Sequence, residues 1–242
     1  MPDPRSYMIE ERLRSAKRIL VVSSGKGGVG KSLVASLVAS VLAREGKRVG
    51  LLDLDFTSPS THVVLGAGDA RLTEDRGIVP AHVQCLEYVS IVSYSHDDPL
   101  PLRGADISNA LIELLAVTRW PDVDYLIIDM PPGTGDAMLD LVRLLKRVEF
   151  IIVTTPSPLA FETVKKVVTL LSEMKVPIAG MIENMKVKGS RFIEEQAVIL
   201  RVPYWGALPY DTQIEDSLGS VSKLLRTSFG KELREMVLLR LR

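Results

Sequence analysis

The stretch of this sequence most suited to chemistry is a glycine-rich loop, SSGKGGVGKS, at residues 23–32. Within it, Gly25, Gly30, Lys31 and Ser32 satisfy the pattern G-x-x-x-x-G-K-[ST]. In such a loop the glycines let backbone N–H groups turn toward phosphate oxygens, the lysine neutralises the terminal phosphates, and the hydroxyl ligates Mg²⁺. A glycine-rich turn without a ligand is the alternative. The predicted strand before the loop and helix after it favour a nucleoside triphosphate site.

The same loop contains a second lysine, Lys26, directly after its first glycine. One lysine is enough to hold the terminal phosphates of a nucleotide. Lys26 is therefore either a solvated surface residue or a second cation with a task of its own.

Three carboxylates end two of the predicted strands. Asp129 ends the apolar run YLIID and is the residue type that holds the water shell of Mg²⁺ beside a phosphate loop, the alternative being a carboxylate that caps a turn. Asp53 and Asp55 follow an earlier strand, and strand alternation points both to one side. Asp55, nearer the end, is our candidate for orienting the attacking water, whereas Asp53 could equally be a structural hydrogen-bond acceptor.

Alternating strands and helices must position these residues. An apolar, β-branched run at residues 18–24 predicts a buried strand before the loop, and helical spacing after the loop continues to Gly46. The strand expected at residues 47–55 completes a right-handed βαβ unit. Further strands are expected at 88–94, 124–129, 149–156, 176–185 and 202–211, and further helices at 5–18, 107–117, 137–146, 159–174 and from Phe229 onward.

This order predicts an α/β fold with a mostly parallel twisted sheet flanked by helices, and ligands at the carboxyl ends of the strands. Residues 65–106 show a looser pattern but no linker long enough to separate domains. We therefore expect residues 1–242 to form a single domain.

Composition limits the possible partners and compartment. The 30 basic and 30 acidic residues cancel and aromatic residues make up 5% of the chain, so no nucleic-acid partner is expected. The single cysteine, Cys85, excludes a disulfide framework and is expected to be a core thiol. With no apolar signal segment or 18-residue apolar run, we expect a cytoplasmic protein. The final amphipathic helix is expected to pack on the domain, with no membrane partner.

The segments KGGVGKS, DLDFTSPS, DYLIIDMPPGTGD, VTTPSPLA, IENM and ALPYD occur in an order and spacing that resemble the Mrp/ApbC-type P-loop ATPases. These are iron–sulfur cluster carriers within the wider MinD/ParA group, with a deviant Walker A loop. The resemblance runs from about residue 18 to residue 219. In that group, the lysine after the first loop glycine reaches across a dimer interface to the partner's nucleotide. Lys26 occupies that position and would stabilise charge on the transferring phosphoryl group.

The resemblance implies a homodimer that binds ATP with Mg²⁺ and hydrolyses it slowly. It assigns Lys26, Lys31 and Asp55 to catalysis, and Ser32 and Asp129 to the metal. The implied nucleotide-binding residues are Gly25, Lys26, Gly27, Gly28, Val29, Gly30, Lys31, Ser32, Asn184, Pro209 and Asp211. Asn184, in IENM, resembles the family residue that hydrogen-bonds adenine, and ATP over GTP rests on it. Arg103 and Gly104 resemble an arginine–glycine pair of less specific role.

The chain departs from the family at the cluster site. Cluster carriers have a C-x-x-C pair soon after the ENM motif, whereas here the segment KVKGSRFIEEQ contains no cysteine. Lys188 and Ser190 are poor substitutes for thiolate ligands, and His62, His82 and His96 are too scattered to suggest a metal site. We therefore do not expect an iron–sulfur cluster. Two other functions stay open: a positioning ATPase acting as a nucleotide-switched binding module, and a cluster-free adaptor for an unknown client protein.

Overall fold

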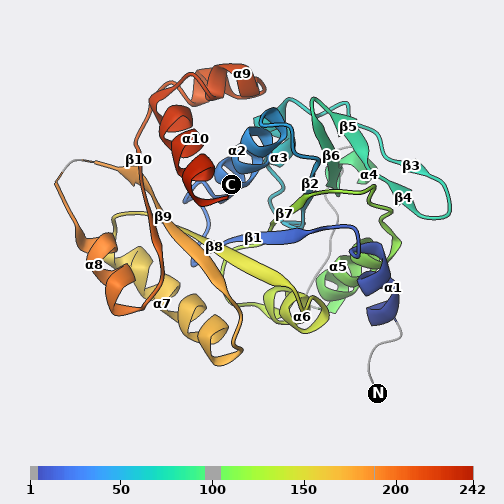
Figure 1. Ribbon diagram of the computed structural model, residues 1–242, viewed down its shortest axis with the longest axis horizontal. Coiled ribbons are helices and arrows are strands. Elements are labelled where there is room, and N and C mark those ends of the chain that lie inside the picture. The colour runs from blue at the N-terminus through green and yellow to red at the C-terminus, as the bar shows by residue number, and fades with distance from the viewer. Residues whose placement is uncertain (1–4, 96–104, 188, 242) are drawn as a thin grey trace.

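An eight-stranded sheet forms the centre of the molecule, in the order β10-β9-β8-β1-β7-β2-β6-β5 (Figure 1). The computed structural model describes residues 5–95, 105–187 and 189–241, so Arg103, Gly104, His96 and Lys188 lie outside the described residues. Neighbouring strands run parallel except at the edge, where β5 is antiparallel to β6. The strands are β1 Arg18–Ser24, β2 Val49–Asp53, β5 Ala81–Val83, β6 Leu86–Ser90, β7 Tyr125–Asp129, β8 Val148–Thr154, β9 Ile178–Lys186 and β10 Tyr204–Pro209. The predicted mostly parallel sheet is confirmed.

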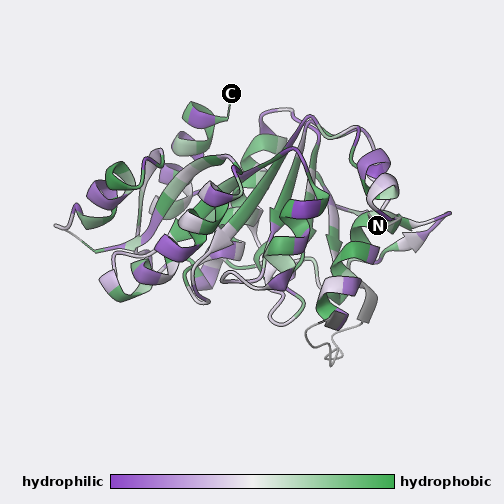
Figure 2. Cartoon of the chain, turned by 90° about the horizontal axis from the view of Figure 1, so that it is seen from below, coloured by the Kyte–Doolittle hydropathy of each residue, from purple (hydrophilic) through white to green (hydrophobic). Residues whose placement is uncertain are grey.

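Helices cover both faces of this sheet (Figure 1). One face carries α2 Lys31–Arg44, α3 Thr61–Leu65, α9 Val221–Leu224 and α10 Ser228–Arg240. The other carries α1 Arg5–Arg12, α5 Ala105–Val117, α6 Asp136–Leu144, α7 Pro158–Glu173 and α8 Phe192–Ile199. Two hydrophobic clusters fill the layers, and the apolar strands lie between helices with hydrophilic outer faces (Figure 2). Burial on both faces explains why the central strands are continuous apolar runs.

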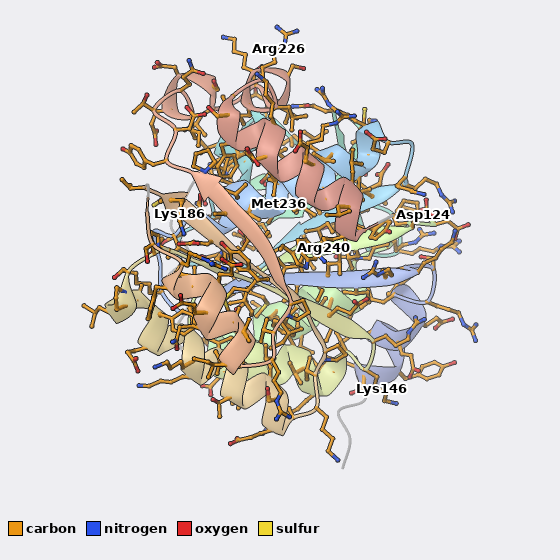
Figure 3. The ribbon with its side chains drawn as sticks, turned by 60° about the vertical axis from the view of Figure 1, so that its left-hand side comes forward. Asp124, Lys146, Lys186, Arg226, Met236 and Arg240 are labelled. Carbon is orange, nitrogen blue, oxygen red and sulfur yellow. The ribbon has the colours of Figure 1, made fainter. Side chains whose placement is uncertain are left out.

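The C-terminal helix α10 packs on the domain, as predicted. Its Phe229, Leu233 and Val237 are buried, and Met236 lies over β10 (Figure 3). Gly206 of β10 makes this close approach possible, because a Cβ atom there would lie 2.7 Å from the Met236 Cε. Within the described part of the chain, no helix is long and apolar enough to cross a membrane.

Several short elements differ from the prediction. The first helix ends at Arg12 rather than near residue 18, and the strand expected at 88–94 ends at Ser90, with α4 Val92–Ser95 following it. The sequence did not predict the hairpin of β3 Thr73–Glu74 and β4 Ile78–Val79. It also did not predict β5, α3, α8, α9 or a 3₁₀ turn at Glu215–Ser217. Elements this short span too few residues to show a hydrophobic period.

Cys85 is exposed, so the prediction of a core thiol is wrong. The residue lies in the tight turn between β5 and β6, preceded by Gln84 in the left-handed region at φ 56°. Strand alternation then buries the next residue, Leu86, at 1% exposure.

Candidate nucleotide-binding site

A cavity of about 830 Å³ opens at the carboxyl ends of the parallel strands. This is the edge at which doubly wound sheets bind ligands. Most of the predicted site residues line it, although they come from four separate parts of the chain: Lys26, Gly27, Gly28, Gly30, Lys31, Ser32, Asp55, Asn184, Pro209 and Asp211. Of the other three, Gly25 packs against α7, Val29 is a buried loop residue, and Asp129 is fully buried and paired with Lys31.

Two glycines of the loop, Gly25 and Gly30, are required by its backbone or by its neighbours. Gly30 has φ 82°, which a residue with a Cβ atom adopts only under strain, and a Cβ there would lie 2.3 Å from Asn184 Nδ2. At Gly25 the limit is space, because a Cβ would lie 2.3 Å from Thr163 Oγ1 of α7. The loop is thus held closely against both β9 and α7.

Lys31 points to two carboxylates. Its Nζ lies 2.7 Å from Asp129 Oδ1, 3.7 Å from Asp55 Oδ2 and 3.3 Å from Ser32 Oγ. The Lys31 side chain is 6% exposed and that of Asp129 is fully buried, so the 2.7 Å pair is shielded from water. The structure therefore brings together the four residues predicted to handle phosphate, Mg²⁺ and the attacking water.

The surroundings of Asp129 fit a metal ion. Burial raises the pKa of Asp129 to about 7, with Lys31 opposing the rise and Asp53 adding to it. The Asp129 Oδ2 is buried and has no hydrogen-bond partner among the described residues. A hydrated Mg²⁺ would supply partners for this oxygen and favour its charged form, and the Ser32 hydroxyl, 3.3 Å from Lys31 Nζ, also interacts with Asp129.

Asp53 and Asp55 have different surroundings. Asp53 is fully buried and accepts hydrogen bonds from Thr61 Oγ1 at 2.6 Å and from the Asp55 N–H at 3.0 Å. Burial raises its pKa, which these bonds partly oppose. These contacts agree with the alternative given for Asp53 in the sequence analysis, a structural hydrogen-bond acceptor. Asp55 lines the cavity, with one oxygen held by Thr57 Oγ1 at 2.8 Å and the other facing Lys31.

Asn184 makes a contact that the sequence did not suggest. Its Nδ2 donates to the Val29 carbonyl of the loop at 2.8 Å, and its Oδ1 accepts from the Met185 N–H at 2.7 Å. Asn184 also lines the cavity. The residue therefore contacts the loop backbone and at the same time faces the space where the resemblance implies that adenine binds. The two partners are 155 residues apart, and no local pattern connects them.

Lys26 lies at the mouth of the cavity with its side chain exposed. Among the residues that the structure describes, none forms an ion pair with its ammonium. The Lys26 ammonium is thus exposed to solvent, whereas the Lys31 ammonium of the same loop is buried against carboxylates.

A strand, a glycine loop carrying lysine and serine, a following helix and a strand-end carboxylate together define the site of a P-loop NTPase. The family model described as ParA, the NUBPL iron-transfer P-loop NTPases, matches residues 15–236, so the chain belongs to this family.

The curated relatives are named iron-sulfur cluster carrier proteins. That of Pseudomonas fragi is 41% identical over 179 residues, covering 72% of this chain and 62% of the relative. That of Deinococcus radiodurans is 36% identical over 220 residues, covering 84% and 61%. The Escherichia coli protein is 42% identical over 178 residues but matched over only 48% of its length. The chain therefore spans about half to three-fifths of the curated relatives it matches.

Solved structures agree with the fold. A nucleotide-binding protein in complex with ADP from Archaeoglobus fulgidus is 31% identical, with a TM-score of 0.76 and 92% of each chain covered. The cell division ATPase MinD of Pyrococcus furiosus is 20% identical, with a TM-score of 0.69 over 92% of this chain and 97% of that chain. At this identity, the second likeness supports the fold alone.

Proposed function

We propose that this chain is a Mg²⁺-dependent ATPase that works as a homodimer and hydrolyses ATP slowly. The observation that carries the proposal is the Lys31 ammonium, buried between Asp129 and Asp55 at the base of a cavity built from a phosphate loop. The ADP named for the Archaeoglobus fulgidus protein, at 31% identity, supports an adenine nucleotide as the ligand.

Each residue has a role that its position supports. Lys31 exchanges its carboxylate partners for the β- and γ-phosphates, while loop amides surround the phosphate oxygens. Ser32 and Asp129 hold Mg²⁺, which neutralises charge on those oxygens when bound. Asp55 orients the water that attacks the γ-phosphate, so that ADP and inorganic phosphate leave. The Asn184 amide group has one N–H bonded to Val29 and a second available for adenine.

Lys26 acts on the nucleotide of the neighbouring subunit. Its exposed side chain at the cavity mouth can reach a second copy facing the same edge of the sheet. A cation supplied by the partner stabilises charge that develops on the transferring phosphoryl group, as an arginine finger does. Turnover then depends on dimer formation, whereas nucleotide binding does not.

The chain holds no iron–sulfur cluster in the manner of the carriers. Such clusters need thiolate ligands, and two copies of a chain with one cysteine supply two. Within the described residues, no group of three or more His, Cys, Asp and Glu side chains could hold a metal ion, and Cys85 lies exposed in the turn before β6. We therefore propose an ATPase without the cargo site that the carriers use.

Two lysine variants test the ATPase assignment. We expect Lys31→Ala to weaken ATP binding by about 100-fold, because a charged hydrogen-bonding partner of the phosphates is lost. Lys26→Ala is expected to bind ATP within about twofold of the parent but to turn over at least about tenfold more slowly. Binding is measured by calorimetry and turnover by phosphate release, with the exposed Lys146→Ala as the control. Equal loss of binding in the Lys26 and Lys31 variants would contradict separate roles.

Anaerobic reconstitution with iron and sulfide tests the cargo assignment. We expect no stable brown protein and less than stoichiometric iron after desalting, since the thiolates are missing. The Escherichia coli iron-sulfur cluster carrier protein, treated in parallel, serves as the positive control. Stoichiometric iron bound to this chain would overturn the proposal.

A further inference from the structure

Ser24, the last residue of β1, is bonded to two functional loops at once. Its Oγ donates to the Lys26 carbonyl at 2.9 Å, and its own carbonyl accepts the Gly133 N–H at 2.8 Å. Ser24 itself is fully buried. One residue thus joins the loop that carries Lys26 to the Pro- and Gly-rich segment 131–135 that follows β7.

The bond to the Lys26 carbonyl constrains more than one atom. A peptide unit is planar, so fixing this carbonyl also fixes the direction of the Gly27 N–H and the plane from which the Lys26 side chain departs. No other hydrogen bond reaches this peptide unit from the described residues, and Gly27 adds no side chain to hold it. Without the Ser24 hydroxyl, the first turn of the loop would rotate more freely.

We infer that Ser24 is a positioning residue for ATP hydrolysis: its hydroxyl holds Lys26 in the direction that meets the neighbouring subunit's nucleotide. The inference rests on the proposed role of Lys26 across the dimer. It adds a physical connection, because Gly133 lies in the segment adjacent to Asp129, and its N–H bond to Ser24 links that segment to the position of Lys26.

The chain offers a matched control one residue earlier. Ser23 lies on the same strand, is 1% exposed, and has an Oγ without a hydrogen-bond partner among the described residues. Ser23→Ala and Ser24→Ala therefore remove the same atom from similarly buried sites, but only the second removes a bond to the loop. We expect Ser23→Ala to keep the parental kinetics.

Steady-state kinetics provide the first measurement. We expect Ser24→Ala to lower kcat by about three- to tenfold, the loss of one hydrogen bond, with KM for ATP within about twofold of the parent. In a Lys26→Ala background, Ser24→Ala should have no further effect on kcat, because the two residues act as one unit. A full additional loss in that background would show that Ser24 acts on something other than Lys26.

Trypsin provides a second measurement that does not depend on the dimer. Trypsin cuts between Lys26 and Gly27, at the carbonyl that Ser24 holds. With ADP and Mg²⁺ present, we expect cutting at this bond to be at least about threefold faster in Ser24→Ala than in Ser23→Ala, because cleavage follows local opening. Mass spectrometry of the fragments identifies the bond that is cut.

The outcomes separate the two proposals. If Lys26→Ala is slow while Ser24→Ala matches Ser23→Ala in both assays, the positioning role is wrong and the role of Lys26 stands. If Lys26→Ala turns over like the parent, the role of Lys26 is wrong, and the catalytic consequence drawn for Ser24 fails with it, whatever trypsin shows.

Discussion

Lys31 has two competing sets of partners. In the structure its ammonium pairs with Asp129 at 2.7 Å and faces Asp55 at 3.7 Å, whereas the proposed nucleotide binding requires it to face phosphates. The same two carboxylates are the groups proposed to hold Mg²⁺ and to orient water. Under the proposed function, binding of nucleotide with Mg²⁺ would therefore free Lys31 for the phosphates and both carboxylates for the reaction in a single exchange.

This exchange predicts the behaviour of Asp129→Asn. The asparagine amide is neutral, so it binds Mg²⁺ weakly. It also competes only weakly with the nucleotide phosphates for the Lys31 ammonium. Without Mg²⁺, we expect the variant to bind ADP about three- to tenfold more tightly than the parent, because Lys31 is free and a like charge near the phosphates is gone. Adding Mg²⁺ should tighten binding in the parent and leave the variant nearly unchanged.

Calorimetry with ADP in EDTA and in MgCl₂ measures both effects. Asp122→Asn is the control, because that carboxylate is 77% exposed and belongs to the opposite edge of the sheet. If Mg²⁺ tightened ADP binding to Asp129→Asn as much as to the parent, Asp129 would not be the metal ligand.

At the scale of elements, the sequence predicted the central strands well because their physical signal is strong. The central residues of β1 and β7, ILVV and LII, are all apolar because helices cover both faces of the sheet, and such a run strongly favours a buried strand. The loop and the carboxylate that ends β7 follow directly from those strands. Parallel register then sets Asp53 beside Asp129, which brings both toward Lys31.

What escaped prediction depends on contacts between distant segments. The bond from Asn184 to the Val29 carbonyl joins residues that only the order of strands in the sheet brings together. The antiparallel β5 and the exposed Cys85 depend on a tight turn at Gln84, where one residue decides which side chains face the core. The hydrophobic periodicity of a single segment predicts its secondary structure but not its contacts with distant segments.

At the amino ends of the strands, opposite the cavity, a different carboxylate stabilises the sheet. Asp124, just before β7 (Figure 3), accepts from Lys17 Nζ at 2.7 Å and from the Arg48 N–H at 2.9 Å, which ties together the segments that lead into β1, β2 and β7. These two bonds hold the pKa of Asp124 well below its usual range. The stabilisation is therefore present above pH of about 4, where the unfolded carboxyl is ionised, and decreases as the pH falls below it.

We expect Asp124→Asn to lower the free energy of unfolding by about 1 kcal/mol at pH 7, a decrease in Tm of about 2–4 °C for a chain of this size. The difference from the parent should shrink near pH 3, where part of the Asp124 contribution has been lost. Thermal melts at both pH values measure this, with Asp122→Asn as the exposed neighbour that should behave like the parent. An equal Tm deficit at both pH values would show that the charge of Asp124 is not what stabilises this edge.

On the scale of the whole molecule, the features of the candidate site gather at one edge of the sheet. The cavity, the exposed Lys26 and the N-terminal turn of α7, with Leu159 82% exposed, all lie at the carboxyl ends of the strands. α7 lies directly against the loop, since Gly25 fits only because it has no Cβ atom near Thr163. In the proposed dimer, a second copy that receives Lys26 would face this edge, and a two-fold axis would complete both sites together.

Mixing inactive variants tests whether the two sites are completed in this way. Lys26→Ala keeps a complete site of its own but offers no lysine to its partner, whereas Asp55→Asn has a defective site but still offers Lys26. If Lys26 acts across the interface, a mixed dimer has one working site of two. Random mixing in equal amounts makes about half of the dimers mixed, so we expect about a quarter of the parental turnover from two preparations that are each nearly inactive. Asp55→Asn mixed with Lys31→Ala is the control, because both defects lie in the subunit's own site and neither partner repairs the other. Recovery in the first mixture alone would require Lys26 to act between subunits, and recovery in neither would mean that it acts within its own.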